Sequence, residues 1–314
     1  MIDWSNLGAA LQAQRCFSDI FFESSSMSDE EKTRQFKSFL LSLHSELSDL
    51  AGAVNYKDHR PGTHVDRQKI LFESVDVYRY LLAVLNLWGI DAGTFASALE
   101  QKDHLLHYRH LLQQRSWAGQ PVVLFDMDDV LAGFRDKFCE FSTQRYGFFV
   151  DPDSPEYYNT NAFKAHGASD ADAFAEFIDA RGFSTLGVIQ PYMDLMFSLK
   201  EMGYWVHIVT ARPERSRFCY HDTYSWLSRH SVPADAVTFT PEKYAWLVGQ
   251  PYVSSAGLFA IDDSPKHAAE YAKHGVRVLV PSRPYNREIA GLKNVTYVGP
   301  DDSPLDKVRE LLSL

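Results

Sequence analysis

An apolar run that ends in two aspartates constrains this chain more than any other feature of its sequence. Residues 122–125 read Val-Val-Leu-Phe, Asp126 and Asp128 follow, and the chain becomes apolar again at Val130 and Leu131. A short, fully apolar run predicts a buried strand, and open α/β folds place their chemistry where such strands end. Two carboxylates at this spacing suit a hard cation such as Mg2+, and an aspartate can also form an acyl-phosphate. Because Asp-x-Asp alone is common in loops, its meaning depends on the residues downstream.

Short β-branched runs alternate with helical patterns throughout residues 121–314. The predicted strands are Val122–Phe125, Trp205–Val209, Val237–Thr240, Leu258–Ile261, Val276–Val280 and Val295–Val298, with helical patterns such as Tyr192–Met202, Arg215–Arg229 and Lys266–Lys273 between them. This alternation predicts an α/β domain with a doubly wound, mostly parallel sheet. Residues 134–188 show no strand alternation, which predicts a small, mostly helical cap inserted after the first strand.

Residues 1–115 carry a different pattern, which predicts an all-α helical bundle of about four helices. Asp29 opens one run of apolar residues at helical spacing. A second run, 69–88, is apolar nearly all round and predicts a central helix. A break is expected at 59–62, His-Arg-Pro-Gly, and a linker at 113–121.

Composition limits the classes of protein to which the chain can belong. It has 314 residues, 45% hydrophobic and 23% charged, as expected for a globular protein of two domains. Its three cysteines, Cys16, Cys139 and Cys219, lack a CxxC motif, which argues against a disulfide framework or a zinc site. We expect neither a signal peptide nor a membrane partner, and a cytoplasmic location, because no basic start precedes an apolar run and no stretch approaches about 18–20 apolar residues. The net charge of −10 disfavours a stable nucleic-acid partner.

Three polar segments follow other predicted strands of the second domain. Thr210 ends one strand, Lys243 follows the next, and Asp262 and Asp263 end the one after that. Alone, each can be a strand-end hydroxyl or a solvated charge. Together with Asp126 and Asp128, in this order and each after a strand, they form a specific combination.

This ordered set resembles the haloacid-dehalogenase-like superfamily from Pro121 to the C-terminus. The resemblance implies that Asp126 is the nucleophile and forms an aspartyl-phosphate. It implies that Asp128 protonates the leaving oxygen and then deprotonates the attacking water. An acidic residue at this second position favours ester hydrolysis, because an alkoxide leaves poorly without a proton.

The same resemblance assigns the remaining polar groups. Thr210 and Lys243 would hold the phosphoryl oxygens. Apart from the resemblance, Arg212 is a candidate for a substrate contact through phosphate, although a surface ion pair is the favoured interpretation. Mg2+ would be bound by Asp126, the backbone carbonyl of Asp128 and Asp263, with Asp262 as support.

Within the superfamily, residues 126–132 are similar to the first motif of the 5'(3')-deoxyribonucleotidases. Residues 181–183 and 189–191 look like their return from cap to core, and 224–227 like the helix after their threonine motif. One departure is Asp129, which stands where these enzymes usually have glycine and adds a carboxylate near the site. Nucleotides are therefore the expected substrates.

Two alternatives stay open for this domain. The phosphatase domain of polynucleotide kinase-phosphatases has similar motifs, which would make the substrate a 3'-phosphate on a nucleic-acid end. Aromatic cap residues either stack on a base or form the core of the cap itself: Phe134, Phe138, Phe141, Tyr157, Tyr158 and Phe163.

The helical domain carries two carboxylate pairs, Glu46/Asp49 and Glu73/Asp76. Each pair is spaced i, i+3 and shares a helix face. The second helix is otherwise apolar, where an ionised carboxylate is unfavourable unless it is paired or bound to metal. The pairs predict an oxygen-rich Mg2+ site, with two solvated helix faces as the alternative.

This pattern resembles the all-α NTP pyrophosphatase superfamily, the dimeric dUTPases and MazG-like proteins, over residues 1–112. Lys102 and Arg109 match the cationic pair that contacts the triphosphate there, whereas Asp103 and Leu106 replace the usual asparagines. The resemblance implies an (d)NTP pyrophosphohydrolase and a homodimer through the helical domain, and an inactive dimerisation scaffold is the alternative. The hypothesis is a two-domain, Mg2+-dependent nucleotide hydrolase that converts a triphosphate to monophosphate and then removes the last phosphate.

Overall fold

The computed structural model describes residues 5–20, 24–54 and 65–312. The chain divides into two compact units, Met1–Gln101 and Lys102–Leu314. Helix α4, Ala92–Gln113, runs across this division. The domain limits at 115 and 121 therefore stay a prediction, and the expected break at 59–62 lies outside the described residues.

The first unit is built from helices whose starts are capped by side chains. It holds α1 (Ser5–Ser18), the 3-10 turn η1 (Ser24–Ser26), α2 (Asp29–Ala51), α3 (Arg67–Leu87) and the first turns of α4. At the start of α2, Ser28 and Glu31 form a capping box. The side chains of Asp66 and Asp91 accept hydrogen bonds from the backbone at the starts of α3 and α4. Among the described residues no single helix is long and apolar enough to cross a bilayer; only α3 and α4 together, bent by 115°, meet that length and composition.

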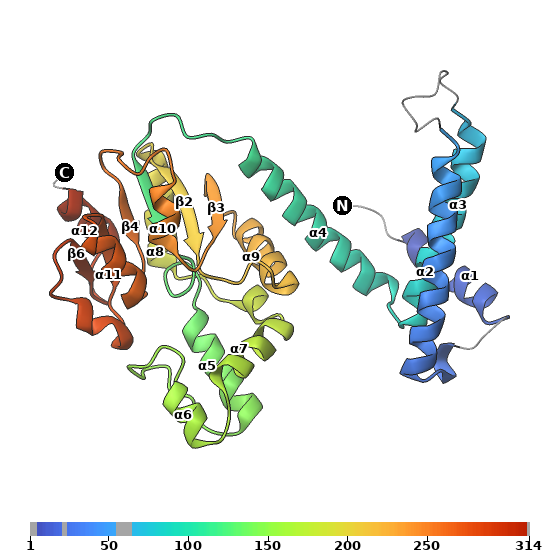
Figure 1. The fold of residues 1–314 in the computed structure, drawn as a ribbon, viewed down its shortest axis with the longest axis horizontal. Helices are drawn as coiled ribbons and strands as arrows, with labels where there is room; N and C mark the ends of the chain where they lie inside the picture. Colours follow the sequence, from blue (N-terminus) through green and yellow to red (C-terminus); the bar gives the residue numbers. More distant parts are fainter. Residues whose placement is uncertain (1–4, 21–23, 55–64, 313–314) are drawn as a thin grey trace. The chain divides into compact units, whose positions relative to one another are not determined.

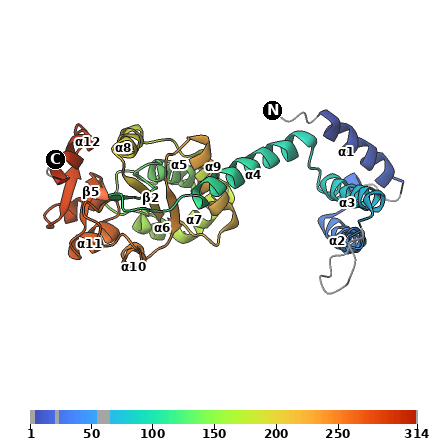
Figure 2. The ribbon, with the colours of Figure 1, turned by 90° about the horizontal axis from the view of Figure 1, so that it is seen from above.

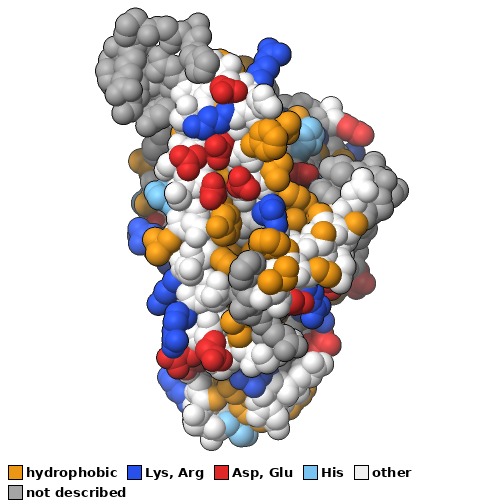
Figure 3. All heavy atoms as spheres, turned by 90° about the vertical axis from the view of Figure 1, so that its right-hand side faces the viewer, with side chains coloured by type: hydrophobic (Ala, Val, Ile, Leu, Met, Phe, Trp, Pro, Cys, Tyr) orange, Lys and Arg blue, Asp and Glu red, His pale blue; other side chains and the backbone are white. Residues whose placement is uncertain are grey.

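Helix α3 is central to the first unit but is not buried all round. Leu82 and Leu85 pack on α1, and Leu87 packs with Phe39 of α2. The opposite side of α3 is exposed in the single chain, although the sequence of this helix is apolar nearly all round. The exposed side chains, at 44–61% of their surface, are Leu71, Phe72, Val75, Tyr78 and Leu81. Figure 3 shows such surface hydrophobic side chains beside groups of Asp and Glu.

The second unit contains a six-stranded parallel sheet in the order β3-β2-β1-β4-β5-β6 (Figure 1). The strands are β1 (Val122–Phe125), β2 (Trp205–Thr210), β3 (Ala236–Phe239), β4 (Phe259–Ile261), β5 (Arg277–Pro281) and β6 (Val295–Val298). Strand order reverses at β1, with β2 on one side and β4 on the other. This is the switch point at which doubly wound sheets place their sites. The predicted fold class is confirmed.

Alternate side chains of β1 enter two separate cores, one on each face of the sheet. Val123 and Phe125 pack with residues of α8, α9 and α12, whereas Val122 and Leu124 pack with residues of α10 and α11. Figure 2 shows α8 and α12 on one side of the sheet and α10 and α11 on the other. These helices are α8 (Gln190–Glu201), α9 (Arg217–Arg229), α10 (Lys243–Val248), α11 (Pro265–Lys273) and α12 (Pro304–Leu312).

A helical cap separates β1 from α8, as predicted. It comprises α5 (Phe134–Tyr146), α6 (Thr160–Ala165), α7 (Asp170–Asp179) and the 3-10 turn η2 (Gly182–Thr185). Its two connections to the core lie side by side, because the backbone N of Gly133 donates to the oxygen of Gly187 and that of Ile189 to Leu131. Within the cap, Gly182 lies so close to the ring of Phe177 that a Cβ atom would meet it at 2.3 Å. The two segments that connect the cap to the core are thus paired by backbone hydrogen bonds next to the carboxyl end of β1.

Candidate active site

The carboxyl ends of neighbouring strands bring the predicted phosphatase residues to one edge of the sheet. Phe125 of β1 is paired with Ile208 of β2 and with Ile261 of β4. The residues that follow, among them Asp126 and Asp262, therefore leave the sheet at the same level. Thr210 ends β2, Lys243 begins α10 after β3, and Asp263 follows Asp262. The structure thus assembles all of these groups.

Lys243 is buried between two carboxylates. Its Nζ lies 2.8 Å from Oδ1 of Asp126 and 2.7 Å from Oδ2 of Asp262, and 1% of its side chain is exposed. Burial opposes the charged ammonium, but the two carboxylates outweigh it and raise the pKa of Lys243. Oδ1 of Asp126 also accepts a hydrogen bond of 2.7 Å from the backbone N of Met127. These two contacts orient the Asp126 carboxylate.

The acidic groups outnumber the cations at this edge. Oxygens of Asp126, Asp262 and Asp263 lie within 4.8 Å of one another, and all three residues are buried. Burial, followed by the neighbouring carboxylates, raises the pKa of Asp263 well above its ordinary value. One ammonium does not balance three carboxylates, and a divalent cation with oxygen ligands would. The donor set therefore fits Mg2+.

Asp262 and Asp263 differ in the oxygens that they leave free. Asp262 uses one oxygen for Lys243 and the other for the backbone N of Ser264, at 3.0 Å. Within the described residues, Asp263 accepts one side-chain hydrogen bond, from the hydroxyl of Tyr285 to Oδ2 at 2.5 Å. Asp263 is thus the better placed of the two to bind a metal ion directly.

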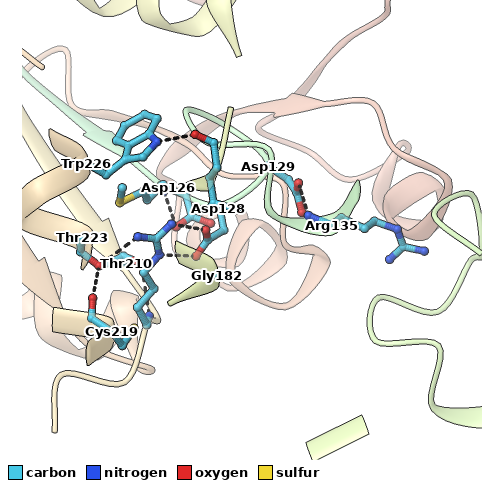
Figure 4. Close-up of polar contacts among 12 residues, drawn as sticks. Asp126, Asp128, Asp129, Arg135, Gly182, Thr210, Cys219, Thr223 and Trp226 are labelled. Atoms are coloured by element: carbon cyan, nitrogen blue, oxygen red, sulfur yellow. Dashed lines mark hydrogen bonds and ion pairs between the residues drawn. The ribbon is translucent and has the colours of Figure 1, made fainter. Parts of the chain in front are cut away.

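Asp128 is paired with Arg212. The guanidinium donates from Nη2 to Oδ1 at 2.6 Å and from Nε to Oδ2 at 2.9 Å. It also donates from Nη1 to the hydroxyl of Thr223 at 2.9 Å. Figure 4 shows Asp128 and Thr223 joined by these contacts, with Asp126 close by. Burial raises the pKa of Asp128, while Arg212 opposes the rise. The structure thus gives Arg212 a buried ion pair rather than a surface one, and its contact with phosphate stays a prediction.

A cavity of about 350 Å3 opens onto these carboxylates. Its polar side includes Asp126, Asp128 and Asp263, and its other side is aromatic. The aromatic lining consists of Phe134, Tyr157, Tyr158 and Phe174. Of the cap aromatics considered from the sequence, Phe138 and Phe163 are instead fully buried in the core, and Phe141 packs against it.

Asp129 occupies a backbone conformation that glycine favours. Its φ is 55°, in the left-handed region. The side chain accepts a 2.9 Å hydrogen bond from the backbone N of Arg135, at the start of α5 (Figure 4). It accepts a second one, at 3.3 Å, from the hydroxyl of Tyr157. Burial raises the pKa of Asp129 to about 7. The aspartate that replaces glycine therefore ties the loop after β1 to the cap.

Sequence reasoning missed several polar groups that follow β4 and β5. Tyr285 and Asn286 lie on the 3-10 turn η3 (Pro284–Ile289), where Asn286 donates to the backbone oxygens of Asp263 and Pro281. His267 at the start of α11 also lines the cavity, and burial, then Lys243, lowers its pKa to about 4. A usable signal existed, because these polar residues follow predicted strands of the same sheet.

The helical unit brings together the predicted acidic groups. Carboxylate oxygens of Glu46, Asp49 and Glu73 lie within 4.8 Å of one another. Asp76 lines a cavity of about 700 Å3 together with Glu46 and Arg79. Burial and the nearby Asp76, Asp49 and Glu73 raise the pKa of Glu46. The four residues thus surround one region of the unit.

Lys102 and Arg109 belong to the other unit of the chain. Lys102 is exposed, and the guanidinium of Arg109 lies 5.5 Å from the ring centre of Tyr220 in α9. Their contact with a triphosphate stays a prediction.

Several solved structures are similar to the second unit. A predicted phosphatase from Clostridium acetobutylicum is 16% identical, with a TM-score of 0.45, and covers 63% of this chain and 100% of its own. A putative haloacid dehalogenase-like hydrolase from Bacteroides fragilis is 16% identical, with a TM-score of 0.42, and covers 58% of this chain and 97% of its own. A putative phosphatase from Clostridium difficile is 12% identical, with a TM-score of 0.44, and covers 62% and 100%. A search of curated proteins found no match.

A family model matches the sequence itself. It is described as 5' nucleotidase, deoxy (pyrimidine), cytosolic type C protein, and it matches residues 120–297, which is more than half of the chain. The matched segment contains every residue of the candidate phosphatase site described above. The second unit is thus a haloacid-dehalogenase-type phosphatase, and the chain belongs to the family of 5' nucleotidase, deoxy (pyrimidine), cytosolic type C proteins.

Proposed function

We propose that the second unit is a Mg2+-dependent nucleotide phosphomonoesterase that acts through an aspartyl-phosphate on Asp126. One observation carries this proposal: Asp126 is held by Lys243 at the same sheet edge as Asp128, Thr210 and Asp263. A nucleophile, a proton donor and a metal ligand around one cavity, with a hydroxyl at the same sheet edge, are the groups that phosphate ester hydrolysis needs.

The residues divide the reaction into two steps. In the first, an oxygen of Asp126 attacks phosphorus, the bond from phosphorus to the sugar oxygen breaks, and Asp128 gives that oxygen a proton. In the second, Asp128 takes a proton from water, the water oxygen attacks phosphorus, and the bond to Asp126 breaks. Thr210 and Lys243 stabilise the phosphoryl oxygens in both steps. Asp126, the backbone carbonyl of Asp128 and Asp263 would hold Mg2+, with Asp262 as support, and the ion would supply further positive charge.

The cavity supports a nucleoside monophosphate as substrate. Tyr158 is 38% exposed, and Phe174 is partly exposed on the same aromatic side, so both can pack against a base. The family description names deoxy pyrimidine nucleotides. We therefore propose a pyrimidine deoxynucleoside 5'-monophosphate as the preferred substrate.

For the helical unit we propose a (d)NTP pyrophosphohydrolase. The cluster of Glu46, Asp49 and Glu73, with Asp76 beside the same cavity, supports a site for Mg2+. The exposed apolar side of α3 supports a homodimer through this unit, since burial of such a patch favours self-association. The product would be a substrate for Asp126.

One assay tests both proposals separately. The protein with Mg2+ is given NTPs, dNTPs, nucleoside monophosphates and a 3'-phosphorylated oligonucleotide, and phosphate and pyrophosphate are followed independently. Asp126→Asn should abolish phosphate release and keep pyrophosphate release, and Glu73→Gln should do the reverse. Unchanged phosphate release in Asp126→Asn would overturn the phosphatase proposal. Release from the oligonucleotide alone would instead favour a 3'-phosphatase with a scaffolding helical unit.

A further inference from the structure

Arg212 holds both carboxylate oxygens of Asp128. The two contacts, 2.6 and 2.9 Å, form a parallel, bidentate pair. The Arg212 side chain is 1% exposed, and that of Asp128 is 16% exposed. A bidentate pair fixes the plane of a carboxylate as well as its distance. The orientation of Asp128 is therefore set by Arg212.

The guanidinium of Arg212 is itself fixed by two other elements. Its Nη1 donates to Thr223 of α9, whose hydroxyl donates to the backbone oxygen of Cys219 at 2.8 Å. The ring of Phe183, in η2 of the cap return, lies 4.1 Å from the guanidinium carbon. Arginine stacks on such rings and keeps its fork geometry. Arg212 thus links Asp128, in the loop after β1, to both the core and the cap.

Asp126 and Asp128 are held by different cations. Lys243 contacts Asp126, and Arg212 contacts Asp128 through both oxygens. We propose that Arg212 is the positioning residue for Asp128: it aims the carboxyl group at the leaving oxygen and then at the attacking water. This inference rests on the proposed function of Asp126 and Asp128. It assigns Arg212 to proton transfer rather than to the binding of the phosphate.

Two substrates with different leaving groups can distinguish whether Arg212 positions Asp128 or binds the phosphate. The sugar oxygen of a nucleotide leaves poorly without a proton, whereas p-nitrophenolate leaves well without one. With p-nitrophenyl phosphate, attack by Asp126 therefore needs no help from Asp128, and only the later attack of water does. A misplaced Asp128 should slow both steps for a nucleotide but only the second for p-nitrophenyl phosphate.

The test is rapid-mixing kinetics of Arg212→Lys on both substrates at one pH. For a deoxynucleoside monophosphate we expect kcat to fall about 10²–10³-fold, with KM close to that of the wild type and no burst of nucleoside. For p-nitrophenyl phosphate we expect a burst of p-nitrophenol stoichiometric with the chain, followed by slow turnover. Added guanidinium ion should partly restore turnover in Arg212→Ala.

A matched control is Arg181→Lys, because Arg181 forms a comparable pair with Asp222 and does not line the cavity. It should leave the kinetics on both substrates unchanged. A rise in KM with kcat unchanged, or equal loss of the burst and of turnover in a folded Arg212→Lys, would overturn the inference. If Arg212→Lys does not fold, Thr223→Val removes one hydrogen bond to the guanidinium and should show the same burst in milder form. Absence of turnover by the wild-type protein on either substrate would instead refute the proposed function.

Discussion

The hydroxyl of Tyr285 donates a 2.5 Å hydrogen bond to Oδ2 of Asp263. Asn286, the next residue, holds the backbone oxygen of Asp263 at 2.8 Å. A turn that follows β5 thus orients a carboxylate that follows β4. Groups that hydrogen-bond to a metal ligand tune its affinity for the metal. Tyr285 and Asn286 therefore link η3 to the proposed Mg2+ site.

Tyr285→Phe should therefore weaken the binding of Mg2+ without removing a ligand. We expect the Mg2+ concentration for half-maximal phosphatase activity to rise about 10–100-fold, with kcat restored at saturating Mg2+. Tyr204→Phe is the control, because Tyr204 directly precedes β2 and so lies at the edge of the sheet opposite to the carboxyl ends of the strands. A lower kcat with an unchanged Mg2+ requirement would argue against this role.

Mg2+ should also stabilise the folded protein. Binding at about 100 times the dissociation constant contributes about 2.7 kcal/mol to the free energy of unfolding. Calorimetry with and without EDTA should show this as a shift in Tm. Asp263→Asn should lose the part of the shift that belongs to the second unit, and Glu73→Gln only the part of the helical unit. An undiminished shift in both variants would place Mg2+ elsewhere.

Asp129 offers a comparison of backbone strain with side-chain contacts. Asp129→Ala keeps a Cβ at φ 55° and loses the hydrogen bond to Arg135, so it should destabilise the protein by about 1–2 kcal/mol. Asp129→Gly loses the same bond but removes the strain, so it should be more stable than the alanine variant by about 1 kcal/mol. Urea unfolding measures both values. Equal stability of the two variants would show that the left-handed conformation costs little.

His207 should make the second unit sensitive to acid. It is buried between the hydroxyls of Thr238 and Tyr252, and burial lowers its pKa to about 3. The unfolded chain, with an ordinary histidine pKa near 6.5, binds the extra proton, so stability falls as pH drops below about 6.5. On going from pH 7 to pH 5, the titration of His207 should lower the free energy of unfolding by about 2 kcal/mol.

The measurement is the difference in free energy of unfolding between pH 7 and 5. His207→Gln should remove about 2 kcal/mol of that difference, whereas His104→Gln, at an exposed position of α4, should keep it. A His207 variant with the wild-type pH dependence would contradict the assignment.

The strands could be predicted closely from the sequence because they are short β-branched runs between helical patterns, and β1, β2 and β4 are buried along their whole length. β1 and β6 begin and end at the predicted residues, and the other four strands are shifted by one or two residues at most. Buried parallel strands read as unbroken apolar runs, so their ends are sharp. The short helix α10 and the last helix α12 were not predicted, since few turns give little periodicity.

The site was predictable where its residues stand directly after strands. Asp126, Thr210 and Asp262 share one sheet edge for that reason. The contacts of Arg212 with Asp128 and Phe183 join residues far apart in the sequence, and only the tertiary fold brings them together. The apolar pattern of α3 predicts a central helix, but it does not say which neighbour covers each face.

Trapping the covalent intermediate tests the central claim most directly. Wild-type protein and Asp128→Asn are mixed with p-nitrophenyl phosphate and Mg2+, quenched in acid, and mapped by mass spectrometry. We predict a phosphoryl group on Asp126, in larger amount in Asp128→Asn because water attack is slowed. Turnover of substrate with the phosphoryl group on another residue, or on none, would contradict the account.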